Sequence, residues 1–375
     1  MQVLNGKYTS AKIFTDTIEE YALAQLQLLV DHPAFEGSRI RIMPDVHPGK
    51  VGTIGFTATV TERILPNVVG NDIGCGMTVA RLKRSRTEFQ KLDVVIREAV
   101  SSGSSLRKKP HRFGADFDLA GLLCAEHINA DRTARSLGTL GGGNHFIELD
   151  QDENGELYVV IHSGSRHLGT AVTEYYLTTG QQYLKKRGID VPHELVYLEG
   201  NLLADYIHDV EVAQKFAQLN REAILDELTK GMQWKLSETH SCIHNYIDTD
   251  VPAQTGKALI RKGAISANAG EAVIIPINMR DGVIFGTGLG NEDWNYSAPH
   301  GAGRVMKRQD VKASFTVSQY KKEMKGIYST CIGKGTLDEA PFAYRNIGQI
   351  ADAIKETVKV DKILKPVYNF KAGGE

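Results

Sequence analysis

The sequence is poor in cysteine, almost balanced in charge and free of long apolar runs. Its 375 residues contain four cysteines, Cys75, Cys124, Cys242 and Cys331. None forms a Cys-x-x-Cys pair, so a disulfide framework is excluded and a reducing, cytoplasmic location is expected. Lysine and arginine number 44 against 45 aspartate and glutamate residues, which excludes a uniformly basic surface but allows a local basic groove. The longest apolar runs, such as 272–277, are far shorter than the ~20 residues that cross a bilayer, so no membrane partner is expected.

The chain also has no internal repeat and no Pro/Ser-rich linker. Length alone would allow two domains of about 150 residues each. Because 42% of the residues are hydrophobic and no linker divides the chain, we expect one large domain over residues 1–375. Helical and strand patterns mix without a steady βαβ rhythm. The predicted fold class is therefore α/β or α+β, with mixed β-sheets flanked by helices rather than a Rossmann sheet.

Apolar spacing predicts individual elements. Helices are expected over 17–30, 87–100, 116–130 and 347–358, and one helix or two over 202–230. Strands are expected over 39–43, 52–60 and 157–161, with a strand pair over 272–276 and 283–285. Between these elements lie several glycine-rich segments that each carry a polar side chain able to bind a ligand.

The first such segment is DIGCG at 72–76. Asp72 and Cys75 are three residues apart and flanked by glycines, so the backbone is free to turn both side chains toward one ion. A hard oxygen beside a soft sulfur suits Mn, Zn or Fe better than Mg or Ca. The alternative for this segment alone is a tight turn with a buried thiol.

The second segment is GGGNHF at 141–146. Three glycines let the backbone approach a phosphate closely, and Asn144 and His145 would project from the strand that follows. A glycine hairpin with a hydrogen-bonded core histidine is the alternative.

Three more segments contain a histidine. His162 opens HSGSR at the end of a predicted strand, with Arg166 four residues on, and His244 lies in the polar run CIHNY. His244 alone would be typical of a core histidine. In HGAGR, His300 stands beside two glycines and is followed by Arg304, Lys307 and Arg308. A histidine with glycines and three cations is typical of a phosphate-handling site, with a nucleophile or base and groups that stabilise charge.

Together these segments offer five candidate metal ligands, which are Asp72, Cys75, His145, His162 and His244. Five ligands suffice for two ions that share the thiolate as a bridge. Two ions about 3.5–4 Å apart are able to hold both sides of a phosphoryl transfer. His300 is then left over and need not be a ligand.

The five segments occur in the order found in the RtcB family of RNA ligases, and MPDVHPG at 43–49 resembles that family's upstream signature. The resemblance extends from about residue 40 to Lys371. It implies a single-domain α/β fold and an enzyme that uses two Mn²⁺ ions and GTP. Such an enzyme joins RNA ending in a 2′,3′-cyclic phosphate or 3′-phosphate to RNA with a 5′-hydroxyl, in RNA repair or tRNA splicing. The short chain resembles the compact bacterial branch, so archease or a release-factor-H-type protein is the partner to expect.

The resemblance also implies residue roles. Asp72, Cys75 and His145 would hold one metal, and Cys75, His162 and His244 the other. His300 would be the catalytic nucleophile that carries GMP before an RNA-3′-pp-G end forms. The nucleotide would contact Asn144, His145, Phe146, Glu148, Asn245, Asn278, His300, Gly301, Ala302, Gly303, Tyr344 and Lys371. RNA phosphates would be bound by Arg166, Arg304 and Arg308, whose guanidinium groups suit bidentate contacts.

One catalytic role follows from the chemistry of imidazole. A neutral ring attacks phosphorus only when one nitrogen keeps its lone pair, so the other nitrogen must donate a hydrogen bond. We expect Asp45 to accept that bond from His300.

The chain departs from the family pattern at Ile243, where many relatives have a second histidine, and at two places that bear on the base pocket. Val283 replaces a serine hydroxyl that would contact the guanine edge, so GTP selectivity would depend on Glu148 and on compensation by Asn278 or Asp281. The chain also continues beyond Lys371, and a shift of Lys371 would loosen the base pocket.

Two other functions stay open, a dinuclear phosphoesterase that only opens cyclic phosphates and an RNA-end-binding module with a structural metal. Surplus ligands and an unused histidine fit a closed structural site poorly.

Overall fold

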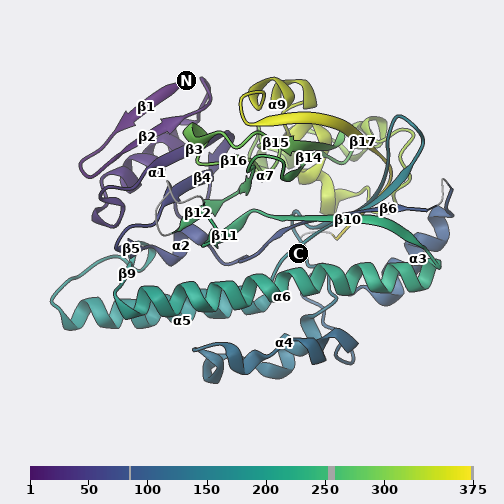
Figure 1. The fold of residues 1–375 in the computed structure, drawn as a ribbon. Helices are drawn as coiled ribbons and strands as arrows, with labels where there is room; N and C mark the ends of the chain where they lie inside the picture. Colours follow the sequence, from purple (N-terminus) through teal and green to yellow (C-terminus); the bar gives the residue numbers. More distant parts are fainter. Residues whose placement is uncertain (84–85, 252–257, 373–375) are drawn as a thin grey trace.

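The computed structural model describes residues 1–83, 86–251 and 258–372. The residues beyond Ala372, which belong to the extension that follows Lys371, lie outside this description. Two sheets dominate the part described (Figure 1). The first contains, in spatial order, β1 (Gln2–Asn5), β2 (Ser10–Ile13), β3 (Ile40–Pro48), β4 (Thr53–Thr59), β12 (Leu259–Lys262) and β11 (Asn245–Asp248).

The second sheet is the one that positions the site. It contains, in spatial order, β10 (Leu236–Ile243), β6 (Gly76–Leu82), β8 (Leu157–Ser163), β7 (Phe146–Gln151), β17 (Val358–Lys371), β15 (Gly282–Gly288) and β14 (Ala272–Asn278). Two short pairs complete the described sheet structure, β13 (Ala264–Ser266) with β16 (Ser297–Pro299) and β5 (Arg63–Ile64) with β9 (Leu198–Glu199). Among the described ladders only that between β2 and β3 is parallel. The predicted mixed α/β fold class is therefore confirmed, and the sheets are not of the Rossmann type.

Helices cover the sheets. They are α1 (Glu20–Val30), α2 (Pro66–Val69), α3 (Phe89–Ala99), α4 (Ala130–Ser136), α5 (His167–Lys186), α6 (Asn201–Met232), α7 (Arg308–Ser314), α8 (Val317–Glu323) and α9 (Ile347–Ala353). Figure 1 shows α6 running along one side of the molecule beside α5, with α4 beyond them. Helix α6 contacts β11 of the first sheet and β6 and β8 of the second, so it joins the two sheets. None of the helices in the described ranges combines the length and apolar character needed to cross a bilayer.

Most predicted elements are present with small shifts at their ends. The helix predicted over 17–30 begins at Glu20, and the segment 202–230 is one helix rather than two, ending where Gln233 turns left-handed at φ 54°. Buried Tyr206, Val210, Ala213 and Ala217 recur at helical spacing along α6, which explains why a continuous helix forms. The predicted pair over 272–276 and 283–285 is the β14–β15 hairpin.

The helix predicted over 116–130 is wrong. Short 3₁₀ turns over 119–121 and 125–127 stand there instead, and α4 begins only at Ala130. The Asp118 side chain accepts from Ala120 N at 3.0 Å and caps the start of the first turn, with Asp118 itself in an extended conformation. Leu123 N and Cys124 N donate to the carboxylate of Asp209, so these amides are lost to any helix ladder.

The helix predicted over 347–358 is also wrong at its end. It stops at Ala353, and Val358 already belongs to β17. The β-branched residues of 358–363 pair with β15, and this long-range pairing outweighs the local helical pattern.

The buried carboxylate of Asp209 gives a test of this packing. Its oxygens accept from Leu123 N at 2.7 Å, Cys124 N at 3.1 Å and the Tyr176 hydroxyl at 2.8 Å. Asp209→Ala leaves these donors without an acceptor and should lower the free energy of unfolding by about 3 kcal/mol in urea titrations. Glu222→Ala, on the exposed side of the same helix, should change it by less than about 0.5 kcal/mol. Equal stability of the two variants would contradict this account.

Candidate functional site

The candidate metal ligands meet at one edge of the second sheet. Cys75 directly precedes β6, His145 directly precedes β7, His162 is next to the end of β8, and His244 directly follows β10. β6 is antiparallel to β8 and β10, and β7 is antiparallel to β8, so two strand beginnings and two strand ends share that edge. The pairings Met77–His162 and Phe146–His162 fix the register.

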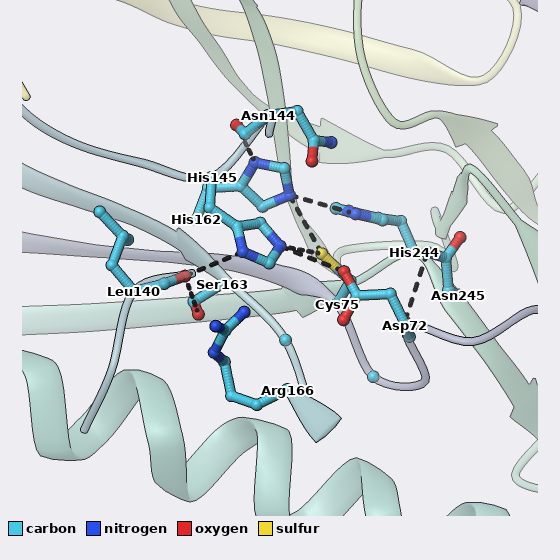
Figure 2. Close-up of polar contacts among 12 residues, drawn as sticks. Asp72, Cys75, Leu140, Asn144, His145, His162, Ser163, Arg166, His244 and Asn245 are labelled. Atoms are coloured by element: carbon cyan, nitrogen blue, oxygen red, sulfur yellow. Dashed lines mark hydrogen bonds and ion pairs between the residues drawn. The ribbon is translucent and has the colours of Figure 1, made fainter. Parts of the chain in front are cut away.

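At this edge the side chains form two groups of three that share Cys75. One group contains Cys75, His162 and His244, the other Asp72, Cys75 and His145, and the ligand atoms within each group lie within 4.8 Å of one another. Cys75 Sγ is 3.3 Å from His145 Nε2 and 3.2 Å from His162 Nε2. His145 Nε2 is 3.1 Å from Asp72 Oδ2, and His162 Nε2 is 3.3 Å from His244 Nε2 (Figure 2). These are the two sets that the sequence predicted.

Two of the three histidine rings are oriented as in many metal sites, while His244 Nδ1 has no hydrogen-bond partner among the described residues. His145 Nδ1 donates to Leu140 O at 2.8 Å and His162 Nδ1 donates to Asn144 O at 3.2 Å, so both Nε2 lone pairs face Cys75 (Figure 2). Backbone acceptors commonly orient metal-ligating histidines in this way. Lone pairs that converge on a thiol and a carboxylate repel one another, and a bound cation relieves that repulsion. The residues therefore fit a metal centre.

Burial sets the protonation of this cluster. It lowers the pKa of His162 and of His244 well below the ordinary value, so both rings stay neutral, which is the form that binds metals. Burial also raises the pKa of the Cys75 thiol, so its thiolate needs a nearby positive charge. Burial alone would raise the pKa of Asp72, but His145 beside it lowers it below the ordinary value.

Two buried side chains of α6 hold the ligand-bearing segments together. Arg221 donates to Gly74 O at 2.9 Å and Ser163 O at 3.1 Å, next to Cys75 and His162. Asn220 accepts from Gly138 N and donates to Gly164 O, which connects the segment before His145 to the one after His162. Sequence reasoning missed both residues, because a polar residue in a long helix carries no local sign that it will be buried.

Glycine is required at one point of closest approach. A Cβ on Gly164 would lie 2.1 Å from Asp72 Oδ1. Any side chain there would displace the carboxylate from the cluster. This explains a glycine two residues beyond His162.

His300 lies next to this cluster, and Asp45 holds it. His300 Nδ1 is 2.8 Å from Asp45 Oδ2, as expected from the chemistry of imidazole, and Asp45 is fully buried. The His300 ring centroid is 4.9 Å from that of His244. His47 Nδ1 donates to Asp45 O at 2.9 Å, and its ring is nearly parallel to that of His300 at 6.5 Å. His47 was not among the predicted site residues, although it belongs to the 43–49 segment.

A cavity opens beside His300. Of the residues predicted to contact a nucleotide it is lined by Asn144, Phe146, Glu148, Asn278, His300, Gly301, Ala302, Gly303, Tyr344 and Lys371. His145 and Asn245 do not line it. Asn245 instead accepts from Gly263 N at 2.9 Å and donates to Asp72 O at 3.4 Å, so it supports the metal-ligand segment. Glu339, which the sequence analysis did not single out, also lines the cavity.

The three predicted phosphate-binding arginines lie in two places. Arg304 and Arg308 line the cavity beside His300, where both pair with Glu339. Arg166 lines a second cavity with Asp72 and His145, and it donates to Gly103 O at 2.7 Å. The metal-ligand cluster therefore borders two cavities with arginine in each.

Asn278 and Asp281 were expected to replace the serine hydroxyl that Val283 lacks, but their polar atoms are largely engaged with each other and with Arg280. Val283 is fully buried in the core. Asn278 lines the cavity, but its oxygen accepts from Arg280 N and Asp281 N within the β14–β15 turn, and its nitrogen donates to Asp281 Oδ2 at 2.9 Å. Among the residues predicted to contact the nucleotide, Glu148 and Lys371 provide the carboxyl and ammonium groups available to a base edge.

Glu148 and Asp150 are two buried carboxyl groups on the same face of β7. Burial raises the pKa of Glu148 to about 7 and raises that of Asp150 well above the ordinary value, with Glu148 adding to the effect on Asp150. Neither Asp150 oxygen has a hydrogen-bond partner within the described residues. Asp150 therefore carries a proton under conditions in which an exposed aspartate is ionised.

This protonation predicts a pH-dependent stability. Between the unfolded pKa of about 4 and the raised folded pKa, the unfolded chain binds fewer protons, so wild-type stability falls as pH rises. Asp150→Asn cannot ionise there and should melt above the wild type by a margin that grows from pH 5 to pH 8. Asp352→Asn, an exposed control, should show no such growth. A constant margin for Asp150→Asn would contradict the prediction.

Comparison with known proteins agrees with the resemblance. The family model described as tRNA-splicing ligase RtcB matches residues 25–118 and 116–372. RNA-splicing ligase RtcB of Escherichia coli strain K12 is 30% identical over 408 residues, which cover 99% of this chain and 99% of that protein. tRNA-splicing ligase RtcB of Aeropyrum pernix is 28% identical over 401 residues, covering 83% of this chain and 82% of that protein. For tRNA-splicing ligase RtcB of Archaeoglobus fulgidus the identity is 26% over 434 residues, with 92% of this chain and 89% of that protein covered. The chain therefore belongs to the RtcB family of RNA-splicing ligases.

Proposed function

We propose that this chain uses GTP and two Mn²⁺ ions to join an RNA 3′-phosphate or 2′,3′-cyclic phosphate end to a 5′-hydroxyl end. The observation that carries the proposal is the position of His300. Its Nδ1 is held at 2.8 Å by a buried carboxylate, and its ring lies at the border between the metal-ligand cluster and the cavity. Such a histidine presents an unprotonated Nε2 as a nucleophile.

The cavity supplies contacts for a purine nucleotide. Phe146 and Tyr344 offer aromatic faces for the base, and Glu148 and Lys371 offer an acceptor and a donor for its edge. The glycines after His300 allow the backbone to pack closely, since a Cβ on Gly303 would lie 2.7 Å from Asp45 O. The guanine edge, with adjacent N–H donors and a carbonyl acceptor, suits this pair of charges.

The reaction then proceeds in three transfers. His300 Nε2 attacks the α-phosphorus of GTP, the N–P bond forms and pyrophosphate leaves. An oxygen of the RNA 3′-phosphate attacks the same phosphorus, which breaks the N–P bond and yields RNA-3′-pp-G. The 5′-hydroxyl oxygen attacks the RNA 3′-phosphorus, GMP leaves and a phosphodiester forms. A cyclic end must first be opened by water to the 3′-monoester.

The chain's own residues assist these steps. Asp45 holds the His300 ring in one orientation and stabilises the positive charge that develops when Nε2 bonds phosphorus. Arg166, Arg304 and Arg308 bind phosphates from the two cavities. Asp72, Cys75 and His145 would hold one Mn²⁺ and Cys75, His162 and His244 the other, and these cations neutralise phosphate charge. The proposal includes residues 1–375 acting as one catalytic domain in the cytoplasm, with archease or a release-factor-H-type protein as the partner.

Transfer of labelled GMP tests the nucleophile. With GTP labelled at the α-phosphate and Mn²⁺, wild-type protein should become labelled, and His300→Ala should remain at background. Asp45→Asn should label at least about 100-fold more slowly, because an amide does not replace the carboxylate acceptor. His127→Ala, an exposed histidine, should label like the wild type. Opening of cyclic phosphate ends without any protein label would contradict the ligase and favour the phosphoesterase.

Metal content tests the cluster. Wild-type protein dialysed against Mn²⁺ should retain two ions per chain by elemental analysis, and Cys75→Ser should retain fewer than one, because both ligand groups lose their shared thiolate. Mn²⁺ should also raise the melting temperature of the wild type more than that of the variant. Cys331→Ser, which lies outside both groups, serves as the control. Two ions retained by Cys75→Ser would exclude the bridging role.

A further inference from the structure

Glu339 connects the charged residues of the cavity beside His300. Its Oε2 lies 2.8 Å from Lys371 Nζ and accepts from the Tyr344 hydroxyl at 2.6 Å. Its Oε1 pairs with Arg308 and lies 3.5 Å from Arg304 Nη1. The Glu339 and Lys371 side chains are only 4% and 5% exposed, so water does not compete for these contacts.

The residues in this network come from separate elements. Lys371 is the last residue of β17, Arg308 begins α7, and Glu339 ends a 3₁₀ turn over 334–339. The Tyr344 hydroxyl, which donates to Glu339, also accepts a hydrogen bond from Arg304 Nη1 at 3.0 Å. Glu339 is therefore the group through which the C-terminal strand is fixed to the segment that carries Tyr344.

The Glu339 carboxylate is buried and ionised, so it interacts with its neighbours through its charge as well as through packing. Burial alone would raise the pKa of Glu339, but Lys371 first and Arg308 next lower it to about 2, so the side chain stays ionised. One buried anion then faces an ammonium and two guanidinium groups. Its removal would leave Lys371 without its carboxylate partner and free to move.

We propose that Glu339 is a positioning residue for nucleotide binding, which holds Tyr344 against the base and aims Lys371 at the base edge. Lys371 Nζ also lies 5.7 Å from the centroid of the Phe146 ring, which lines the same cavity. The base would then enter between an aromatic ring on β7 and one whose hydroxyl is fixed by Glu339. This inference rests on the proposed function, because it assigns the occupant of the cavity as GTP.

The test compares GTP dependence in Glu339→Gln and wild-type protein. The rate of GMP labelling is measured against GTP concentration, and GTP binding is measured by calorimetry. Glu339→Gln should raise the half-saturating GTP concentration and the Kd about tenfold or more, the effect of losing a buried charge-assisted contact, while the maximal labelling rate stays within about threefold. Mn²⁺ content should remain at two ions per chain.

Two further variants separate positioning from general stability. Glu323→Gln removes a partly exposed carboxylate that pairs with Arg280 and should leave GTP affinity unchanged. Lys371→Met should weaken GTP binding, and combining it with Glu339→Gln should cost less than the sum of the two single effects, because Glu339 acts in part through Lys371. If Glu339→Gln does not fold, Glu339→Asp, which keeps the charge but shortens the reach, should raise the Kd with an unchanged maximal rate.

The outcomes distinguish the inference from the proposed function. Unchanged GTP affinity in Glu339→Gln, or fully additive effects with Lys371→Met, would overturn the positioning role while labelling of the wild type still supports the ligase. Absence of GMP label in the wild type would overturn the ligase proposal, and the calorimetric comparison would still judge Glu339. Absence of GTP binding in wild-type protein would overturn both.

Discussion

The antiparallel pairing of β6, β7, β8 and β10 is the constraint on which the rest of the structure depends. It brings the beginnings of two strands and the ends of two others to one edge, where Cys75, His145, His162 and His244 converge. Side chains alternate between the faces of a strand, so a slip of one residue would turn His162 to the opposite face and remove it from the group that it forms with Cys75 and His244. The geometry of the cluster is therefore set by the register of the sheet rather than by local loop conformation.

Buried polar residues keep that edge in place, and their partners are mostly backbone groups. Arg221 is 1% exposed, and its hydrogen bonds go to the carbonyls of Gly74 and Ser163 and to Thr78 rather than to a carboxylate. Burying an unpaired cation is costly unless its donors are engaged. Placed behind Cys75, it also favours the thiolate there. The buried polar side chains of α6 thus align three segments that are distant in the sequence, those containing Gly74, Gly138 and Ser163.

The sequence predicted the residues of the cluster better than it predicted the framework. Asp72, Cys75 and the histidines are marked locally by flanking glycines and by predicted strand ends, so they could be singled out as candidate ligands without a fold. The helix expected over 116–130 failed because Asp209, far along the chain, takes the amides of Leu123 and Cys124. β17 was missed because its pairing with β7 and β15 has no local signature. Glu339 and Arg221 escaped notice for the same reason, since only the assembled fold supplies the charges and carbonyls that give them a role.

The distribution of charge differs between the two neighbouring parts of the site, the metal-ligand cluster and the cavity beside His300. In the metal-ligand cluster the imidazoles of His162 and His244 are neutral and Asp72 is a carboxylate, so bound cations would supply positive charge there. The cavity beside His300 has built-in cations, Arg304, Arg308 and Lys371, around the carboxylate of Glu339, while burial raises the pKa of its other carboxyl group, Glu148, to about 7. A nucleotide phosphate between them would meet positive charge on both sides, with the Asp45-held His300 at the boundary. That balance favours a polyanion bridging the two halves over a ligand confined to either one.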